Sequence, residues 1–245
     1  MTNRASRHIA PAKRIINYSH DHITFIILAA AMGKRMKTYG PKALLTYRKD
    51  ITILDYTLHT IYEVYPHADI ILILGFESHK FWPYKYKYPS IRFIYNPNYD
   101  TTNTLYGVQI GLHASVGQRV VVLHGDLLFS IEAIDGLAQH GSSITVCDTM
   151  NKENVGIVSQ NNIATNIAYG LENKWGQITY FTNKEYQLLL QLLQTDPEFQ
   201  RLFLYEGIKY IITKGGKFLI HNPLGIQIYD IDSRKDLTRA KRAFK

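Results

Sequence analysis

Short apolar runs of strand length alternate along the chain with segments in which apolar residues recur at helical spacing. Strands are expected at residues 24–29, 69–74, 91–95 and 119–124. Helices are expected at residues 53–65 and 76–84 and from about residue 103. Continuously apolar strands that alternate with helices are typical of a sheet covered on both faces. The pattern therefore predicts an α/β fold with a doubly wound, mostly parallel, Rossmann-like sheet.

The pattern changes in the second half of the chain. Residues 156–159 and 163–169 flank Gln160-Asn161-Asn162, which is typical of a β-hairpin. A leucine-rich helix is expected at 183–194, because Asp196-Pro197 follows it as a helix-breaking pair. The sheet is therefore expected to be mixed, with a late antiparallel insertion.

Two helix starts carry a capping signature. Thr52 stands three residues before Asp55, and Ser233 stands three residues before Asp236. In this arrangement the hydroxyl can accept a hydrogen bond from a free N–H of the first turn. We therefore expect helices to begin directly after Thr52 and Ser233.

Length and charge limit the domain organisation. The chain has 245 residues and a formal net charge of +8. We expect one domain at 23–245 preceded by a basic N-terminal extension at 1–22, which has no acidic residue before Asp21. No apolar stretch approaches the roughly 20 residues of a membrane span, so no membrane partner is expected. The single cysteine, Cys147, cannot form an internal disulfide, which favours the reducing cytoplasm. The charge favours anionic partners; nucleic acid is an unlikely one, because Lys and Arg are spread along the chain.

The segment after the first predicted strand is rich in small and basic residues. It reads Leu28-Ala29-Ala30-Ala31-Met32-Gly33-Lys34-Arg35-Met36, then Gly40-Pro41-Lys42-Ala43-Leu44-Leu45. Ligands of open α/β sheets bind beyond the carboxyl ends of strands, where small residues let backbone N–H groups approach a phosphate. Arg35 and Lys42 would add positive charge there. A turn that merely permits tight packing is the alternative.

Three aspartates lie next to predicted elements elsewhere in the chain. Asp126 comes directly after the apolar run 120–124 and Gly125, and Asp230 and Asp232 precede the last helix. Alternation along a strand puts Asp230 and Asp232 on one face. Carboxylates are the ligands that Mg²⁺ prefers. Taken singly, each could instead be a helix cap or turn residue.

Together these segments resemble the nucleotidyltransferase superfamily of sugar-1-phosphate nucleotidylyltransferases and choline-phosphate cytidylyltransferases. Its signature runs Leu-Ala-Ala-Gly-x-Gly-x-Arg-Met, then Pro-Lys-x-Leu; Ala31 stands at the first glycine. The resemblance implies a nucleotide site formed by Leu28, Ala29, Ala30, Ala31, Met32, Gly33 and Lys34. It also implies catalytic roles for Arg35 on the β- and γ-phosphates and for Lys42 near the reacting phosphates. Asp126 and Asp232 would hold Mg²⁺, with Asp230 as a competing ligand.

The segment from Asn96-Pro97 to Leu105 is similar to a stretch of bacterial choline-phosphate cytidylyltransferase-like members. In it Thr102 and Asn103 would contact nucleotide, or one of them would cap the helix that follows. Residues that fall in the region of the relatives' acceptor pocket are Trp175, Tyr180, Tyr205 and Glu206. Aromatic faces there would suit a quaternary ammonium, although aromatics in strands are ordinarily core residues.

The resemblance implies an Mg²⁺-dependent enzyme that transfers NMP, with CTP as the favoured donor, to a small phosphorylated alcohol or amine such as phosphocholine, releasing pyrophosphate. The first alternative is a sugar-1-phosphate uridylyl- or thymidylyltransferase. A nucleotide-binding pseudo-enzyme is the second, because Ala31, Thr104 and Gly107 depart from the family pattern. A nucleic-acid-binding protein is the third. The sequence leaves the oligomeric state open.

Overall fold

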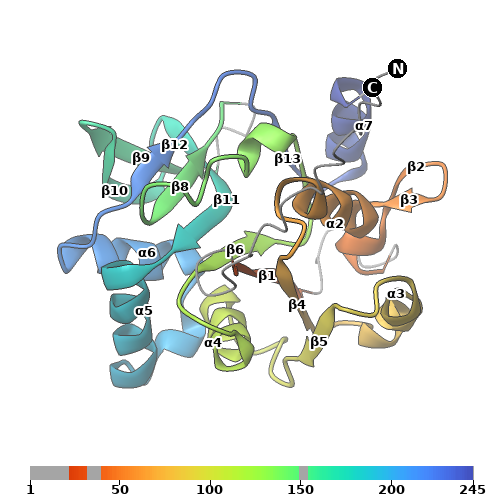
Figure 1. Cartoon of the computed structure of the whole chain (residues 1–245), viewed down its shortest axis with the longest axis horizontal. Helices are drawn as coiled ribbons and strands as arrows, with labels where there is room; N and C mark the ends of the chain where they lie inside the picture. Colours follow the sequence, from red (N-terminus) through yellow and green to blue (C-terminus); the bar gives the residue numbers. More distant parts are fainter. Residues whose placement is uncertain (1–21, 32–39, 149–153, 245) are drawn as a thin grey trace, which may run out of the picture.

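The computed structural model describes residues 22–31, 40–148 and 154–244. A nine-stranded sheet crosses the molecule in the order β5-β4-β1-β6-β11-β8-β12-β10-β9 (Figure 1). Its strands are β1 (Thr24–Ala29), β4 (Asp69–Leu74), β5 (Arg92–Tyr95), β6 (Val120–His124), β8 (Ser143–Val146), β9 (Val155–Gln160), β10 (Ile163–Tyr169), β11 (Asn173–Phe181) and β12 (Leu219–His221). The four strands expected from the first half of the sequence are all present.

The sheet is mixed, as expected. β5, β4, β1 and β6 are parallel neighbours, and β9 and β10 form the predicted antiparallel hairpin. The antiparallel part reaches further than an insertion at the edge, because β11 pairs antiparallel with both β6 and β8 in the middle of the sheet. The carboxyl ends of β1 and β6 therefore lie beside the start of β11.

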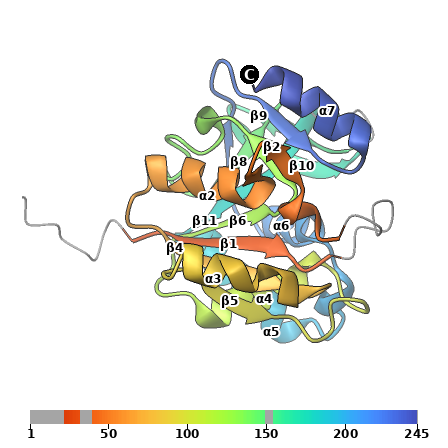
Figure 2. The same cartoon turned by 90° about the vertical axis from the view of Figure 1, so that its right-hand side faces the viewer.

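Helices cover both faces of the sheet (Figure 2). They are α2 (Ile53–Val64), α3 (Trp82–Lys87), α4 (Thr104–Ala114), α5 (Asn183–Thr195), α6 (Leu204–Thr213) and α7 (Arg234–Ala243). Both capping predictions are confirmed, since the Thr52 hydroxyl accepts from Asp55 N and the Ser233 hydroxyl from Asp236 N. The helix expected at 76–84 begins later, as a 3-10 turn at Ser78–Phe81 that leads into α3, where Pro83 fits the first turn.

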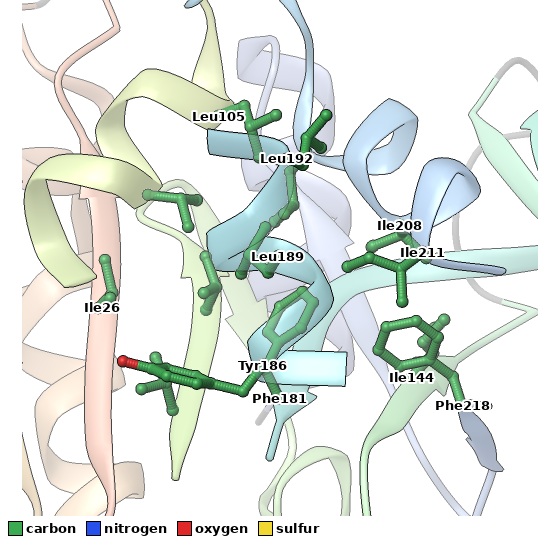
Figure 3. Close-up of a cluster of buried hydrophobic side chains, with 14 of the residues drawn as sticks. Ile26, Leu105, Ile144, Phe181, Tyr186, Leu189, Leu192, Ile208, Ile211 and Phe218 are labelled. Atoms are coloured by element: carbon green, nitrogen blue, oxygen red, sulfur yellow. The ribbon is translucent and has the colours of Figure 1, made fainter. Parts of the chain in front are cut away.

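Two hydrophobic layers hold this arrangement together. One lies between the sheet and α4, α5 and α6, and Figure 3 shows part of it, including Ile26, Phe181 and Leu189. The other lies on the opposite face, beneath α2, and includes Phe25 and Leu58. In the part of the chain that the structure describes, no helix is long and apolar enough to cross a bilayer.

The close contact of α4 with β1 depends on Gly111. A Cβ at this position would lie 2.6 Å from Ile26 Cγ2 and 2.7 Å from Ile26 Cδ1, inside the buried core. We expect Gly111→Ala to lower the free energy of unfolding by about 1–3 kcal/mol, because overpacking outweighs the gain in helix propensity. Urea unfolding measures the change. Gly107→Ala is the control, since its Cβ would meet the end of the Leu28 side chain at 3.1 Å and Ile73 Cγ2 at an ordinary contact distance of 3.7 Å; equal effects of the two substitutions would contradict the packing argument.

Candidate functional site

Three carboxylates come together through a short strand pair outside the main sheet. β7 (Leu127–Phe129) pairs antiparallel with β13 (Ile228–Asp230), and Ile231 N donates to Asp126 O at 3.0 Å. The pairing sets the end of β13 beside the residue that precedes β7. One carboxylate oxygen each from Asp126, Asp230 and Asp232 lies within 4.8 Å of the others. We call these three residues the acid cluster.

Gly125 brings the acid cluster against the end of β1. Its N–H donates to Leu28 O at 2.9 Å, and a Cβ there would lie 3.0 Å from both Leu28 O and Ala29 Cβ. A side chain at this position would push the turn away from β1. The absence of a Cβ thus explains physically why glycine precedes Asp126.

Lys42 links the segment 40–45 to the acid cluster. It opens a 3-10 turn (Lys42–Leu44), and its Nζ donates to Asp126 Oδ2 at 2.8 Å and to Asp232 Oδ1 at 2.5 Å. Burial alone would lower the pKa of Lys42, but the attraction of Asp126 and Asp232 outweighs burial and holds that pKa above its usual value. Burial likewise opposes ionisation of Asp126, yet Lys42 holds its pKa below the usual range. Both groups are therefore charged at neutral pH.

Asp230 is the member of the acid cluster whose ionisation is opposed by its surroundings. Burial, followed by repulsion from Asp126 and Asp232, raises the pKa of Asp230 to about 8. Gln177 Nε2 donates to Asp230 Oδ2 at 2.7 Å and so fixes its orientation. Gln177 has a φ of +57°, in an irregular part of β11 beside Gly176. Sequence reasoning missed Gln177; a glycine inside a strand was the available signal of such an irregularity.

A cavity of about 360 Å³ opens next to the acid cluster. Its walls combine the carboxylates with aromatic and polar side chains. The lining residues are Thr104, His124, Asp126, Asn154, Val155, Tyr169, Trp175, Gln177, Phe203, Leu204, Tyr205, Asp230 and Asp232. We call this space the acceptor pocket after the acceptor site expected from the sequence; it has a charged end and an aromatic end. Burial lowers the pKa of His124 at its charged end, so the imidazole is neutral there.

The aromatic end of the acceptor pocket is built mainly from rings on two segments. The ring of Tyr205 stacks on that of Phe203 with centroids 6.1 Å apart, and it meets the Tyr169 ring edge-on at 5.3 Å. Trp175 lies edge-on to His124 at 5.8 Å. Tyr169 and Phe203 were not among the residues expected from the sequence, because their proximity depends on where β10 meets the start of α6.

Of the four residues expected at the acceptor, the structure brings two to this pocket. Trp175 and Tyr205 line it, whereas Tyr180 faces the opposite layer, where its hydroxyl accepts from Arg119 Nε at 3.0 Å. The two residues lie on opposite faces of β11: Trp175 belongs to the layer beneath α4, α5 and α6, and Tyr180 belongs to the layer beneath α2. Glu206 is not a lining residue; its carboxylate accepts from Phe203 N at 2.8 Å.

The expected nucleotide loop is described only in part. Leu28 and Ala29 end β1, Ala30 O accepts from Phe76 N at 3.0 Å, and Ala31 is exposed. Met32, Gly33, Lys34 and Arg35 lie outside the described residues.

Thr102 and Asn103 hold the loop before α4. The Thr102 hydroxyl donates to Asn98 O at 2.6 Å, and Asn103 Nδ2 donates to Arg201 O. Asn103 takes the N-cap position of α4, but without a side-chain hydrogen bond to the helix. Thr102 lines a separate polar cavity with Arg201, so neither residue lines the acceptor pocket; a contact with nucleotide stays a prediction.

Comparison with known proteins identifies the fold. The model of the MobA-like NTP transferase domain matches residues 25–204. The chain is similar to CTP:phosphocholine cytidylyltransferase from Streptococcus pneumoniae, with 20% identity and a TM-score of 0.74 over 91% of this chain and 99% of that one. It is also similar to inositol-1-phosphate CTP transferase from T. maritima, with 16% identity and a TM-score of 0.74 over 90% and 94% of the two chains. A putative glucose-1-phosphate thymidylyltransferase from Bacillus anthracis has 15% identity and a TM-score of 0.71 over 90% and 94%. No curated protein sequence matches the chain.

Proposed function

Because the chain belongs to the family of MobA-like NTP transferase domains and is a nucleotidyltransferase, we propose that it transfers a nucleoside monophosphate from an NTP to a small phosphorylated alcohol or amine. CTP is the donor we favour. Two of the similar structures, from S. pneumoniae and T. maritima, are named as CTP-dependent transferases. Phosphocholine is the first acceptor to test, and sugar 1-phosphates with UTP or dTTP are the second.

The observation that carries this proposal is the contact of Lys42 with the acid cluster beside the acceptor pocket. Lys42 comes from the segment 40–45, whereas Asp126 and Asp232 each lie two residues beyond the end of a strand, β6 and β13. This contact supports the proposal, because ligands of open α/β sheets bind beyond the carboxyl ends of parallel strands, and the charged groups lie near the carboxyl ends of β1 and β6.

The acid cluster fits a divalent cation of the Mg²⁺ type. The acid cluster offers three carboxylates whose oxygens lie within 4.8 Å of one another, and such oxygens are the ligands that Mg²⁺ prefers. Two of these carboxylates, Asp126 and Asp232, accept hydrogen bonds from the positively charged Lys42 ammonium, so the site holds a cation. Repulsion within the cluster raises the pKa of Asp230, and a further positive charge would relieve that repulsion. When bound, the metal would neutralise charge on the triphosphate and on the leaving pyrophosphate.

The residues of the chain position the reactants and stabilise charge. An oxygen of the acceptor phosphate attacks the α-phosphorus, a new P–O bond forms, and the bond from the α-phosphorus to the leaving pyrophosphate breaks. The acceptor phosphate is already ionised near neutral pH, so the step needs no general base. Lys42 would neutralise charge on the reacting phosphates, and the acceptor pocket would orient the attacking oxygen.

The test is pyrophosphate release, measured with each of CTP, UTP, dTTP, ATP and GTP against phosphocholine, inositol 1-phosphate and glucose 1-phosphate, with and without Mg²⁺. We expect Mg²⁺-dependent release with CTP and at least one acceptor. NTP binding without release in any pair would replace this proposal with a nucleotide-binding pseudo-enzyme. Binding to DNA or RNA that survives physiological salt would favour a nucleic-acid-binding protein instead.

A further inference from the structure

The strand β11 is irregular beside the acid cluster. Trp175 pairs with Val146 of β8 and Thr179 pairs with Ile144, so four steps along β11 correspond to two steps along β8. We call the segment between Trp175 and Thr179 the β11 bulge. Bulges next to functional sites bend a strand and turn a side chain in a new direction. Gln177 lies in the middle of this one.

The backbone of Gln177 adopts a conformation that is unfavourable for a residue with a side chain. Its φ is +57°, in the left-handed region that favours glycine. A glycine at this position would be free of the strain, yet the chain has a long polar side chain here. Strain of this kind persists only where the surrounding contacts impose it, and it is concentrated at functional sites. The contact that Gln177 makes therefore indicates what the strain is for.

The amide of Gln177 supplies a hydrogen bond to the acid cluster. Its Nε2 donates to Asp230 Oδ2 at 2.7 Å, and the residue also lines the acceptor pocket. The Lys42 ammonium donates to the other two carboxylates, those of Asp126 and Asp232. A charged donor thus holds two members of the acid cluster, and a neutral donor holds the third.

The two donors differ in their effect on a bound cation. The ammonium is positively charged and has to compete with a cation for the oxygens of Asp126 and Asp232. The amide carries no charge, and a carboxylate that accepts one hydrogen bond keeps lone pairs for a metal. Donors of this kind hold a ligating carboxylate in place, and their removal weakens metal binding by about 10–100-fold.

From this geometry we propose that Gln177 is a positioning residue, which holds Asp230 as a ligand of the divalent cation, and that the β11 bulge is the device that brings its amide there. The inference rests on the cation site of the proposed function. It adds to that site a residue that acts on the cation through Asp230. It also predicts that stability and cation binding respond differently when Gln177 is replaced by glycine.

The test is Mn²⁺ binding to the nucleotide-free protein, measured by electron paramagnetic resonance, together with urea unfolding in metal-free buffer. Gln177→Gly removes the amide and the strain, whereas Gln177→Ala removes the amide and keeps the strain. We expect both variants to bind Mn²⁺ about tenfold more weakly than wild type. We also expect Gln177→Gly to unfold at a higher urea concentration than Gln177→Ala, because alanine is disfavoured at a positive φ.

Two further variants separate positioning from a structural role. Gln177→Asn keeps an amide and tolerates a positive φ, but it is one methylene shorter and should bind Mn²⁺ as weakly as Gln177→Gly. Asn162→Gly is the control, since it relaxes a φ of +62° at an exposed turn between β9 and β10. Its Mn²⁺ affinity should stay within about twofold of wild type.

A structural role predicts instead that affinity follows stability, with Gln177→Gly binding Mn²⁺ more tightly than Gln177→Ala. That result, or wild-type affinity in both variants, would overturn the inference and leave the cation site standing. A wild-type protein that does not bind Mn²⁺ would overturn both. The expected loss of affinity, without pyrophosphate release from any NTP in the wild type, would refute the proposed transfer and leave the role of Gln177 standing.

Discussion

Asp126→Asn should reduce Mg²⁺-dependent pyrophosphate release by about 1000-fold or more, the largest effect we expect from any single substitution that keeps the side-chain volume. Asp126 contributes an oxygen to the acid cluster and accepts from Lys42 Nζ at 2.8 Å. The amide of Asn carries no charge and binds a hard cation more weakly than a carboxylate does. The substitution therefore removes charge from the cluster and one of the two ion pairs that hold Lys42.

The same substitution should change the folding stability little. Removing one partner of a buried ion pair is ordinarily costly, but the acid cluster holds three carboxylates against one ammonium. Repulsion from Asp126 helps to raise the pKa of Asp230 to about 8, and that repulsion disappears in the variant. We therefore expect the free energy of unfolding to stay within about 2 kcal/mol of wild type.

Steady-state pyrophosphate release and urea unfolding of the same preparations separate the two effects. Asp135→Asn, which removes an exposed carboxylate outside the cluster, should match wild type in both measurements. Wild-type turnover in Asp126→Asn would show that transfer does not depend on the acid cluster. Loss of the folded state would mean that Asp126 is a structural residue.

Much of the scaffold was predictable because its signals are local. β4 occupies Asp69–Leu74, as expected, since every residue of this buried parallel strand but the first is apolar. The start of α2 followed from Thr52 and Asp55, whose mutual hydrogen bonds need only a three-residue spacing. In both cases the deciding interactions lie within the segment itself.

The acceptor pocket was less predictable, because its residues come from distant parts of the sequence and meet only through strand pairing. Nothing near Asp126 in the sequence indicates that β7 would pair with β13 and bring Asp230 and Asp232 beside it. Family resemblance, not periodicity, suggested that neighbourhood.

Tyr180 illustrates a different limit. It was grouped with Trp175 because both fall in the region of the relatives' acceptor pocket, but the two residues lie on opposite faces of β11. The structure places Tyr180 in the layer beneath α2, with its hydroxyl bonded to Arg119. Because β11 is irregular between Trp175 and Thr179, a strict two-residue period could not have assigned these faces from the sequence.

Lys42→Met should separate catalysis from metal binding. We expect turnover to fall by about 100-fold or more, because the variant loses the positive charge next to the reacting phosphates. At the same time, binding of Mn²⁺ to the nucleotide-free protein should tighten about tenfold, which corresponds to about 1.4 kcal/mol. The Lys42 ammonium bonds to Asp126 and Asp232, so a divalent cation has to compete with it for the same oxygens.

The direction of the Mn²⁺ effect follows from the charges. Only 13% of the Lys42 side chain is exposed, and a charge within about 4 Å of two carboxylates at such a site is weakly screened by water. Without the ammonium, the charges of Asp126 and Asp232 repel each other unscreened, which lowers the free energy of unfolding in metal-free buffer. Mn²⁺ binds the folded state and should therefore restore the lost free energy of unfolding.

Electron paramagnetic resonance of free Mn²⁺ gives the affinity, and thermal unfolding with and without Mn²⁺ gives the linked stability. Lys49→Met removes an exposed positive charge from the same segment and should change neither measurement beyond a factor of about two. Weaker Mn²⁺ binding in Lys42→Met would mean that Lys42 organises the carboxylates for the metal instead of competing with it. Unchanged Mn²⁺ binding together with unchanged turnover would place Lys42 outside the site. Tighter binding with lost turnover would show that Lys42 competes for the metal's oxygens yet is required for transfer, as its contacts with Asp126 and Asp232 predict.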